Sequence, residues 1–132
     1  MPITVDTRFF LTHYLAEADE LKSKTSWKMI ELQSESAVVP TIVLHEVYKF
    51  TYEDVGKEVA YLRVNSIMSS ELRVVDLTPG IAVASANLRC RYKGLPTADS
   101  IIAGTCMETK SKHVLSDDPD FKMIKEIQAE WL

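Results

Sequence analysis

Short apolar runs alternate with longer segments of mixed polarity along the whole chain. The runs have the length of buried strands and cover Ile3–Val5, Ala37–Val39, Leu72–Val75 and His113–Leu115. Nearly continuous apolar runs of this length are typical of strands that are covered on both faces. The intervening segments are long enough to form the helical crossovers that join parallel strands. The pattern therefore predicts an α/β protein.

The segments between these runs carry apolar residues at helical spacing. Their predicted helices begin after Asp6, near Glu17, at Thr41, near Gly56, at Thr78-Pro79 and within Leu95–Asp99. Thr41 and Thr78 are suited to cap their helices, and Pro79 suits a first helical position. On the third helix, Ile42, Val43, Val47 and Phe50 are expected to face the core. The tail that ends in Ala129–Leu132 either adds a final strand or docks on the surface.

Strands that alternate with helices in this order predict βαβ units. The expected fold is a three-layer α/β/α arrangement with a mostly parallel central sheet of four to five strands. A chain of 132 residues with 46% apolar and 26% charged residues is typical of a globular domain. We therefore expect residues 1–132 to form a single domain.

Acidic residues stand at several places where folding alone would not put them. They are Asp6, Glu46, Asp99 and Asp118. Asp6 and Asp118 follow the first and last apolar runs, and ligands of open α/β sheets bind at the carboxyl ends of strands. Glu46 and Asp99 fall on the apolar faces of their predicted helices. Buried carboxylates need a shared cation, and oxygen ligands without a nearby Cys/His motif favour Mg²⁺ or Mn²⁺ over zinc.

Each of these carboxylates also has a structural explanation. Asp6 can cap the helix that follows it, and Asp99 can interact with the dipole of its own helix. Asp118 can belong to the turn chemistry of Ser116–Asp120, and Glu46 can pair with a buried Arg or Lys. The convergence of two strand ends and two helices on one edge of the sheet favours a shared site.

Charge and cysteine content narrow the classes of function. With 15 Lys+Arg against 19 Asp+Glu, the net charge of −4 argues against a protein that coats nucleic acid. A nuclease stays open, because Arg89, Arg91 and Lys93 can meet phosphates locally. Cys90 and Cys106 belong to no metal motif and are expected to be buried free thiols. No apolar run approaches the roughly 18 residues of a membrane span, so we expect a cytoplasmic protein without membrane contact.

Four segments of the chain resemble the PIN domain family, and within it the VapC-type toxins of bacterial and archaeal toxin-antitoxin pairs. They are Val5–Phe10, Thr41–Val47, Gly94–Ala103 and Val114–Phe121. None of these segments identifies the family alone, but the four together, in this order and at this spacing, are specific to it. The resemblance covers essentially the whole chain. It implies a PIN-like fold and an endoribonuclease that depends on Mg²⁺ or Mn²⁺.

The resemblance also implies which residues form the site. The family's catalytic and metal-binding acids carry over onto Asp6, Glu46, Asp99 and Asp118, which we call the predicted set. The family's Thr/Ser-x-Asp element falls on Ser116 and Asp118. Asp117 competes for the fourth position, but Asp118 lies two residues after the hydroxyl and three before Phe121, as the family pattern requires.

Residues beside the predicted set have supporting roles in this interpretation. Thr7 either bonds a carboxylate of the predicted set or caps its helix, and Ser116 either supports the site from outside the metal ligands or serves a turn. Arg8 departs from the family, which usually has a small polar residue there. It either pairs with a carboxylate and weakens metal binding, or it holds a substrate phosphate through its fork.

The resemblance finally implies partners. They are an RNA substrate, a second copy of the chain in a homodimer, and a small antitoxin that places a helix over the acidic pocket. Apolar positions such as Trp27, Met29 and Ile30 offer a groove for that helix, with core packing as the alternative. Two other functions stay open: an RNA-maturation nuclease without a toxin role, and a catalytically silent PIN module that binds a basic protein.

Overall fold

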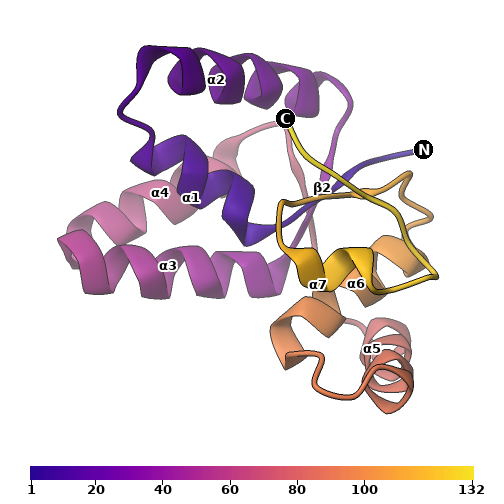
Figure 1. The fold of residues 1–132 in the computed structure, drawn as a ribbon. Coiled ribbons are helices and arrows are strands. Elements are labelled where there is room, and N and C mark those ends of the chain that lie inside the picture. The colour runs from indigo at the N-terminus through magenta and orange to yellow at the C-terminus, as the bar shows by residue number, and fades with distance from the viewer.

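The computed structural model describes residues 1–132 as five strands and seven helices (Figure 1). The strands are β1 (Thr4–Val5), β2 (Val38–Pro40), β3 (Arg73–Val75), β4 (Val114–Leu115) and β5 (Ala129–Glu130). The helices are α1 (Thr7–Leu15), α2 (Asp19–Ser34), α3 (Thr41–Val55), α4 (Lys57–Ser69), α5 (Pro79–Arg91), α6 (Thr97–Glu108) and α7 (Pro119–Lys122). None of the helices is both long and apolar enough to span a membrane.

The strands form one parallel sheet in the order β3-β2-β1-β4-β5. The chain moves outward from β1 to β3 and then crosses back to β4 and β5. Right-handed crossovers place α1 to α4 on one face of such a sheet and α5 to α7 on the other. Figure 1 shows these two groups of helices with the strands between them. The three-layer fold with a parallel sheet is therefore confirmed, and the C-terminal tail adds the fifth strand.

The reversal of strand order lies between β1 and β4, which are neighbours in the sheet. The Asp6 amide donates to the Leu115 carbonyl over 3.2 Å, which extends the pairing of the two strands to their carboxyl ends. Ligands of open α/β sheets bind in the crevice at such a switch point. Residues that follow β1 and β4 are therefore held side by side where a ligand is expected.

The core anchors the segments that leave this switch point. Val5 and Leu115 are fully buried, as expected for strands that are covered on both faces. Phe9 and Phe10 from α1 are also fully buried and pack edge to face, with ring centroids 5.5 Å apart. Phe121 from α7 is buried in the same apolar cluster. These three aromatic side chains fix the turns after β1 and β4.

Helix capping follows the sequence prediction at one threonine but not at the other. Thr78 caps α5, since its Oγ1 accepts a hydrogen bond of 3.1 Å from the Ile81 amide, and Pro79 takes the first helical position. The prediction that Thr41 caps α3 is wrong. Strand β2 runs directly into α3, so Pro40 takes the cap position with an extended backbone, and Thr41 becomes the first helical residue.

Two predicted core side chains are exposed instead. The buried residues of α3 are Val43, Val47 and Thr51, which recur every four positions, so the inward stripe turns away from Phe50. Phe50 is consequently 45% exposed. Cys106 is a buried free thiol as predicted, but Cys90 is exposed because it lies two residues after the buried Leu88 on α5.

Close packing between α5 and α6 generates a prediction for stability. A Cβ atom on Gly104 would lie 3.2 Å from the Ile81 carbonyl oxygen and 3.2 Å from the Ser85 amide nitrogen. Both are backbone atoms of α5, which cannot move aside as the end of a flexible side chain can. We expect Gly104→Val to lower the free energy of unfolding by about 1–3 kcal/mol, the usual cost of overpacking. Gly104→Ala should cost less, because alanine gains about 1 kcal/mol of helix propensity. Urea denaturation measures both.

The matched control is Gly80→Ala on the partner helix α5. The nearest atom to a Cβ there is Oε1 of the flexible Glu108 side chain, which can move aside. This variant should unfold at the same urea concentration as the wild type or a higher one. Wild-type stability for Gly104→Val would contradict the close approach of the two helices.

Candidate metal centre

Acidic side chains from four segments gather at the carboxyl ends of β1 and β4. Asp6 follows β1 and precedes α1, and Asp118 precedes α7 in the loop after β4. Glu46 comes from the second turn of α3, and Asp99 from the first turn of α6. The fold thus brings the predicted set to one end of the sheet, although its members are up to 112 positions apart.

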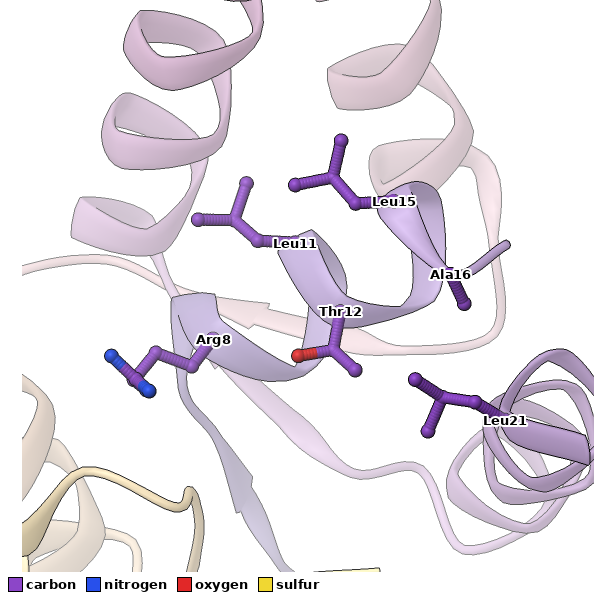
Figure 2. Close-up of a pocket in the computed structure, with 6 residues that line it drawn as sticks. All are labelled: Arg8, Leu11, Thr12, Leu15, Ala16 and Leu21. Atoms are coloured by element: carbon purple, nitrogen blue, oxygen red, sulfur yellow. The ribbon is translucent and has the colours of Figure 1, made fainter. Parts of the chain in front are cut away.

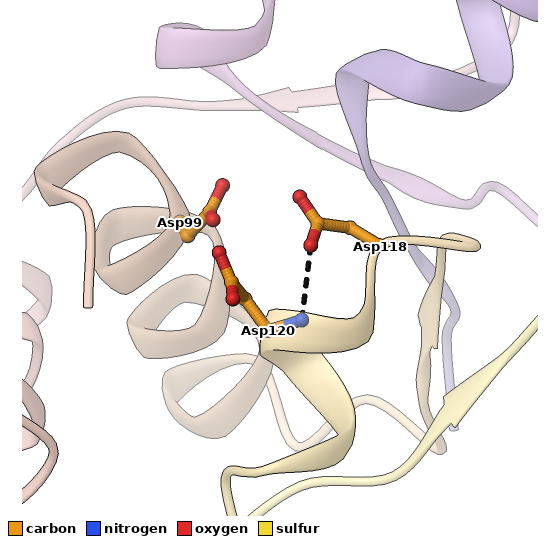
Figure 3. Close-up of side chains that lie close together, drawn as sticks. All are labelled: Asp99, Asp118 and Asp120. Carbon is orange, nitrogen blue, oxygen red and sulfur yellow. Dashed lines mark hydrogen bonds between the residues drawn. The ribbon is translucent and has the colours of Figure 1, made fainter. Parts of the chain in front are cut away.

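Three carboxylates at this end form a close group, which we call the acidic cluster. It consists of Asp99, Asp118 and Asp120, each half-buried, and one oxygen of each lies within 4.8 Å of the others (Figure 3). Like charges at this spacing are unfavourable unless a proton or a cation is shared. Half-buried oxygen donors that lie close together suit a hard divalent cation such as Mg²⁺ or Mn²⁺.

The protonation of Asp99 reflects this crowding. Burial is the main cause that raises the pKa of Asp99 to about 8, and the negative charge of Asp118, a hydrogen bond to Asp120 and the charge of Asp6 raise it further. Without a cation, this crowding therefore favours the protonated form of Asp99. The carboxylate of Asp6 acts on Asp99 electrostatically, although it is not a member of the acidic cluster.

Asp6 is the most deeply buried carboxylate of the predicted set, with 3% of its surface exposed. Burial is the main cause that raises the pKa of Asp6 to about 6. A hydrogen bond from Ser116 opposes this shift, whereas the negative charge of Glu46 adds to it. The Ser116 hydroxyl donates to Oδ2 of Asp6 over 2.6 Å and accepts from the Asp118 amide over 3.0 Å. Ser116 therefore ties the end of β1 to the loop that carries Asp118.

Glu46 is held by a hydroxyl group and not by a cation. Thr7 Oγ1 donates to Oε1 of Glu46 over 2.6 Å, and none of the ion pairs in the structure includes Glu46. The alternative of a buried Arg or Lys partner is therefore wrong. Of the two alternatives for Thr7, the structure therefore shows the bond to a carboxylate of the predicted set and not the helix cap, because Asp6 takes the cap position of α1.

The remaining structural explanations have different outcomes. Asp6 makes no side-chain bond as a cap, so capping does not explain it. Asp118 does cap α7, because its Oδ1 accepts a 2.9 Å bond from the Asp120 amide (Figure 3). Asp99 lies in the first turn of α6, where a helix dipole favours negative charge. Capping and membership of the acidic cluster are compatible for Asp118.

Asp117 bonds a basic residue and is not a member of the acidic cluster. Its Oδ1 accepts a bond of 2.5 Å from Nε of Arg8 across the surface. The geometry therefore favours Asp118 over Asp117 for the fourth position of the predicted set. It also shows that Arg8 pairs with a carboxylate outside the acidic cluster.

Asp120 is the member of the acidic cluster that the sequence analysis missed. It was assigned to turn chemistry, but Pro119 starts a helix there and places Asp120 in its first turn. The available signal was the proline itself, since proline is favoured at the first helical position and acids are favoured in the first turn. Asp118 and Asp120 are brought together by that helix start.

An apolar groove of about 360 Å³ lies beside the acidic end of the sheet (Figure 2). It is lined by Arg8, Leu11, Thr12, Leu15 and Ala16, which come from α1 and its end, and by Leu21 from α2. Figure 2 shows the guanidinium group of Arg8 pointing away from the leucine side chains. The groove therefore has an apolar floor and a cationic end.

The predicted partner surface on α2 is only partly exposed. Trp27 and Ile30 are 72% and 58% exposed, as a docking surface requires. Met29 is half-buried and packs against the core, so the packing alternative holds for this residue. The surface is therefore narrower than the sequence indicated.

The raised pKa of Asp99 predicts how stability depends on pH in EDTA. A carboxyl group whose pKa rises from 3.8 to about 8 on folding binds more protons in the folded state, so its contribution to stability falls as the pH rises through this window. Asp99→Asn removes this loss. We expect the variant to melt several degrees above the wild type at pH 8 and by a clearly smaller margin at pH 5. Equal differences in Tm at both pH values would contradict the raised pKa.

The double role of Ser116 predicts a cost for removing its hydroxyl group. Every buried polar side-chain atom now has a partner, and Ser116→Ala would leave Oδ2 of Asp6 without one. We expect the free energy of unfolding to fall by about 1–3 kcal/mol, measured by urea denaturation at pH 7. Ser116→Thr keeps the hydroxyl and serves as the control. If Ser116→Ala lowers the free energy of unfolding no more than Ser116→Thr does, the Ser116 hydroxyl does not stabilise the Asp6 carboxylate.

Solved structures with the same fold come from toxin-antitoxin systems. A chain of VapBC2 from Rickettsia felis, bound to a fragment of promoter DNA, superimposes with a TM-score of 0.80 at 16% identity, over 100% of this chain and 99% of that one. A chain of DNA-bound VapBC from Salmonella typhimurium gives 0.78 at 19% identity, over 99% and 98%. VapC20 from Mycobacterium tuberculosis, a toxin that cleaves the sarcin-ricin loop, gives 0.74 at 17% identity, over 92% and 93%.

Sequence comparison identifies the family. No match was found among the curated proteins. The sequence profile of the PIN domain matches residues 3–127, which is nearly the whole chain. This match agrees with the strand order, the carboxylates at the switch point and the VapC-like fold. The chain belongs to the PIN domain family.

Proposed function

We propose that the protein is a Mg²⁺- or Mn²⁺-dependent endoribonuclease and the toxin of a VapBC-type pair. The observation that carries the proposal is the convergence of Asp6, Glu46, Asp99 and Asp118 on the switch point of the sheet, with raised pKa values at Asp6 and Asp99. Membership of the PIN family and the fold shared with VapC structures support a nuclease of this type.

The residues present fit a hard divalent cation. Asp6, Asp99 and Asp118 would hold it, with Glu46 completing the site from α3 and Asp120 as a further oxygen donor beside Asp99. When bound, the metal supplies an activated water and neutralises charge that develops on the phosphodiester. Proton loss from Asp99 would accompany metal binding, because a ligand carboxylate has to be ionised.

The chain's own groups orient this set. Ser116 fixes one oxygen of Asp6, and Thr7 fixes one oxygen of Glu46, both over 2.6 Å. Such hydrogen bonds hold ligand carboxylates in one orientation, and losing them typically costs about 10–100-fold in metal affinity or activity. Because Asp99, Asp118 and Asp120 are only half-buried, the site stays open to the backbone of a polymer.

We further propose an antitoxin as the protein partner. The groove between α1 and α2 is apolar along Leu11, Leu15 and Leu21 and ends at Arg8 beside the acidic residues (Figure 2). An amphipathic helix can lay its apolar face into such a groove and reach the acidic site with its end. The toxin-antitoxin structures that share this fold support a partner of this kind. A homodimer is part of the same proposal.

The proposal predicts metal-dependent cleavage that depends on the predicted set. Purified protein should cut labelled single-stranded RNA in Mn²⁺ or Mg²⁺ but not in EDTA. Asp6→Asn and Asp99→Asn should each lower the cleavage rate by more than about 100-fold, since even the loss of an outer hydrogen bond costs about 10–100-fold. Asp54→Asn on the exposed end of α3 is the matched control and should cleave normally.

Several outcomes would contradict this proposal. A folded protein that neither cleaves RNA nor binds Mn²⁺ by calorimetry would be a silent module that binds a basic partner. Undiminished cleavage by Asp99→Asn would indicate a contaminating nuclease. Cleavage without growth arrest on expression in bacteria would keep the nuclease but favour RNA maturation over a toxin role.

A further inference from the structure

Arg8 stands at a position where the resemblance leads one to expect a small polar residue. It belongs to the first turn of α1, two residues after Asp6. Its side chain is 52% exposed and pairs through Nε with the 37% exposed Asp117. This pair joins α1 to the loop after β4, which are the two segments that carry Asp6 and Asp118.

Most of the hydrogen-bonding capacity of Arg8 is unused. A guanidinium group has five N–H donors in a fixed plane, and Arg8 uses the one on Nε. Its two terminal nitrogens make no hydrogen bond within the protein and are free to meet solvent. Paired N–H groups of this kind match two oxygens of one phosphate.

Asp117 gives the guanidinium group a defined orientation. A bond at Nε fixes the plane of the fork and leaves its outer edge open, whereas a bond at the terminal nitrogens would occupy that edge. The charges of Asp118 and Asp6 also act on Arg8 and raise its pKa, together with the larger effect of the bond to Asp117. The cation therefore lies within the field of the acidic residues.

The same contacts argue against an inhibitory role. Arg8 would weaken metal binding if it occupied a carboxylate of the acidic cluster, but its partner is Asp117, which is not a member of that cluster. Two of the basic residues that the charge analysis singled out make contacts of their own within the protein. Arg91 pairs with Glu126, and Nε of Arg89 donates to the Leu95 carbonyl.

We propose that Arg8, oriented by Asp117, binds the non-bridging oxygens of a phosphate next to the scissile phosphate of the RNA strand. The inference rests on the proposed nuclease function and adds a substrate contact to it. Successive phosphates of a nucleic-acid strand carry one negative charge each, and the acidic residues repel them until a cation is bound. A guanidinium group at the rim supplies local attraction for a phosphate in a chain whose net charge is −4.

RNA binding without cleavage tests this contact directly. The probe is a fluorescein-labelled single-stranded RNA of mixed sequence, titrated by anisotropy in Mn²⁺ at several salt concentrations. All proteins carry Asp99→Asn so that the probe is not cut. Adding Arg8→Ala should weaken binding about tenfold, and the slope of log K against log salt should become shallower by about 0.7, the value for one phosphate contact on a single strand.

Two further variants separate charge from geometry. Arg8→Lys keeps the charge without the fork, so the salt slope should stay and only part of the affinity should be lost. Asp117→Asn removes the orienting charge and should weaken binding less than Arg8→Ala does. Lys28→Ala, which removes a cation paired with Glu31 on α2, is the matched control and should bind like the parent.

The binding and cleavage results distinguish a phosphate contact from a surface ion pair and from an inhibitory role of Arg8. Unchanged or tighter RNA binding by Arg8→Ala, or an unchanged salt slope, would overturn the proposal and leave a surface ion pair. If the single variant Arg8→Ala, without Asp99→Asn, binds Mn²⁺ more tightly and cleaves RNA faster than the wild type, Arg8 inhibits the enzyme and the proposal is overturned. If wild-type protein fails to cleave RNA while binding still depends on Arg8, the nuclease proposal fails and the phosphate contact stands.

Discussion

The fold has to hold several mutually repelling carboxylates together at the carboxyl end of its sheet. Asp99, Asp118 and Asp120 approach one another closely, and the charge of the buried Asp6 reaches Asp99. The fold holds these groups together through deeply buried aromatic side chains on α1 and α7, which prevent the two turns from moving apart. Without a cation the strain is relieved by protons, and a divalent metal would relieve it while leaving the carboxylates ionised. Stability and metal affinity are therefore set against each other at this site.

Much of the fold follows from local pattern in the sequence. The strands are readable as apolar runs such as Ala37–Val39 because helices cover both faces of the sheet, and Thr78-Pro79 marks a helix start by its own chemistry. Details that depend on how an element rotates in its surroundings were not readable. Phe50 and Cys90 are apolar residues near buried neighbours, yet the tertiary orientation of their helices turns them to solvent.

The site was predictable to the extent that topology dictates it. Parallel strands end at the same edge of a sheet, so acids in the segments that follow β1 and β4 had to come to the same edge. The position of Asp120 depends on a short helix of four residues that the turn-like composition concealed. The pair between Arg8 and Asp117 spans 109 positions and has no local signal at all. Contacts of this kind are fixed only when the whole chain is folded.

A metal site at these carboxylates can be tested by locating Mn²⁺ through its anomalous scattering in crystals of the protein. We expect a peak between α1, α6 and the loop after β4, bonded by oxygens of Asp6, Asp99 and Asp118. Ser116 and Thr7 should keep their bonds to the carboxylates when the metal is present. If a crystal soaked in excess Mn²⁺ shows no peak among these residues, or only a peak elsewhere on the surface, the carboxylates do not form a metal site.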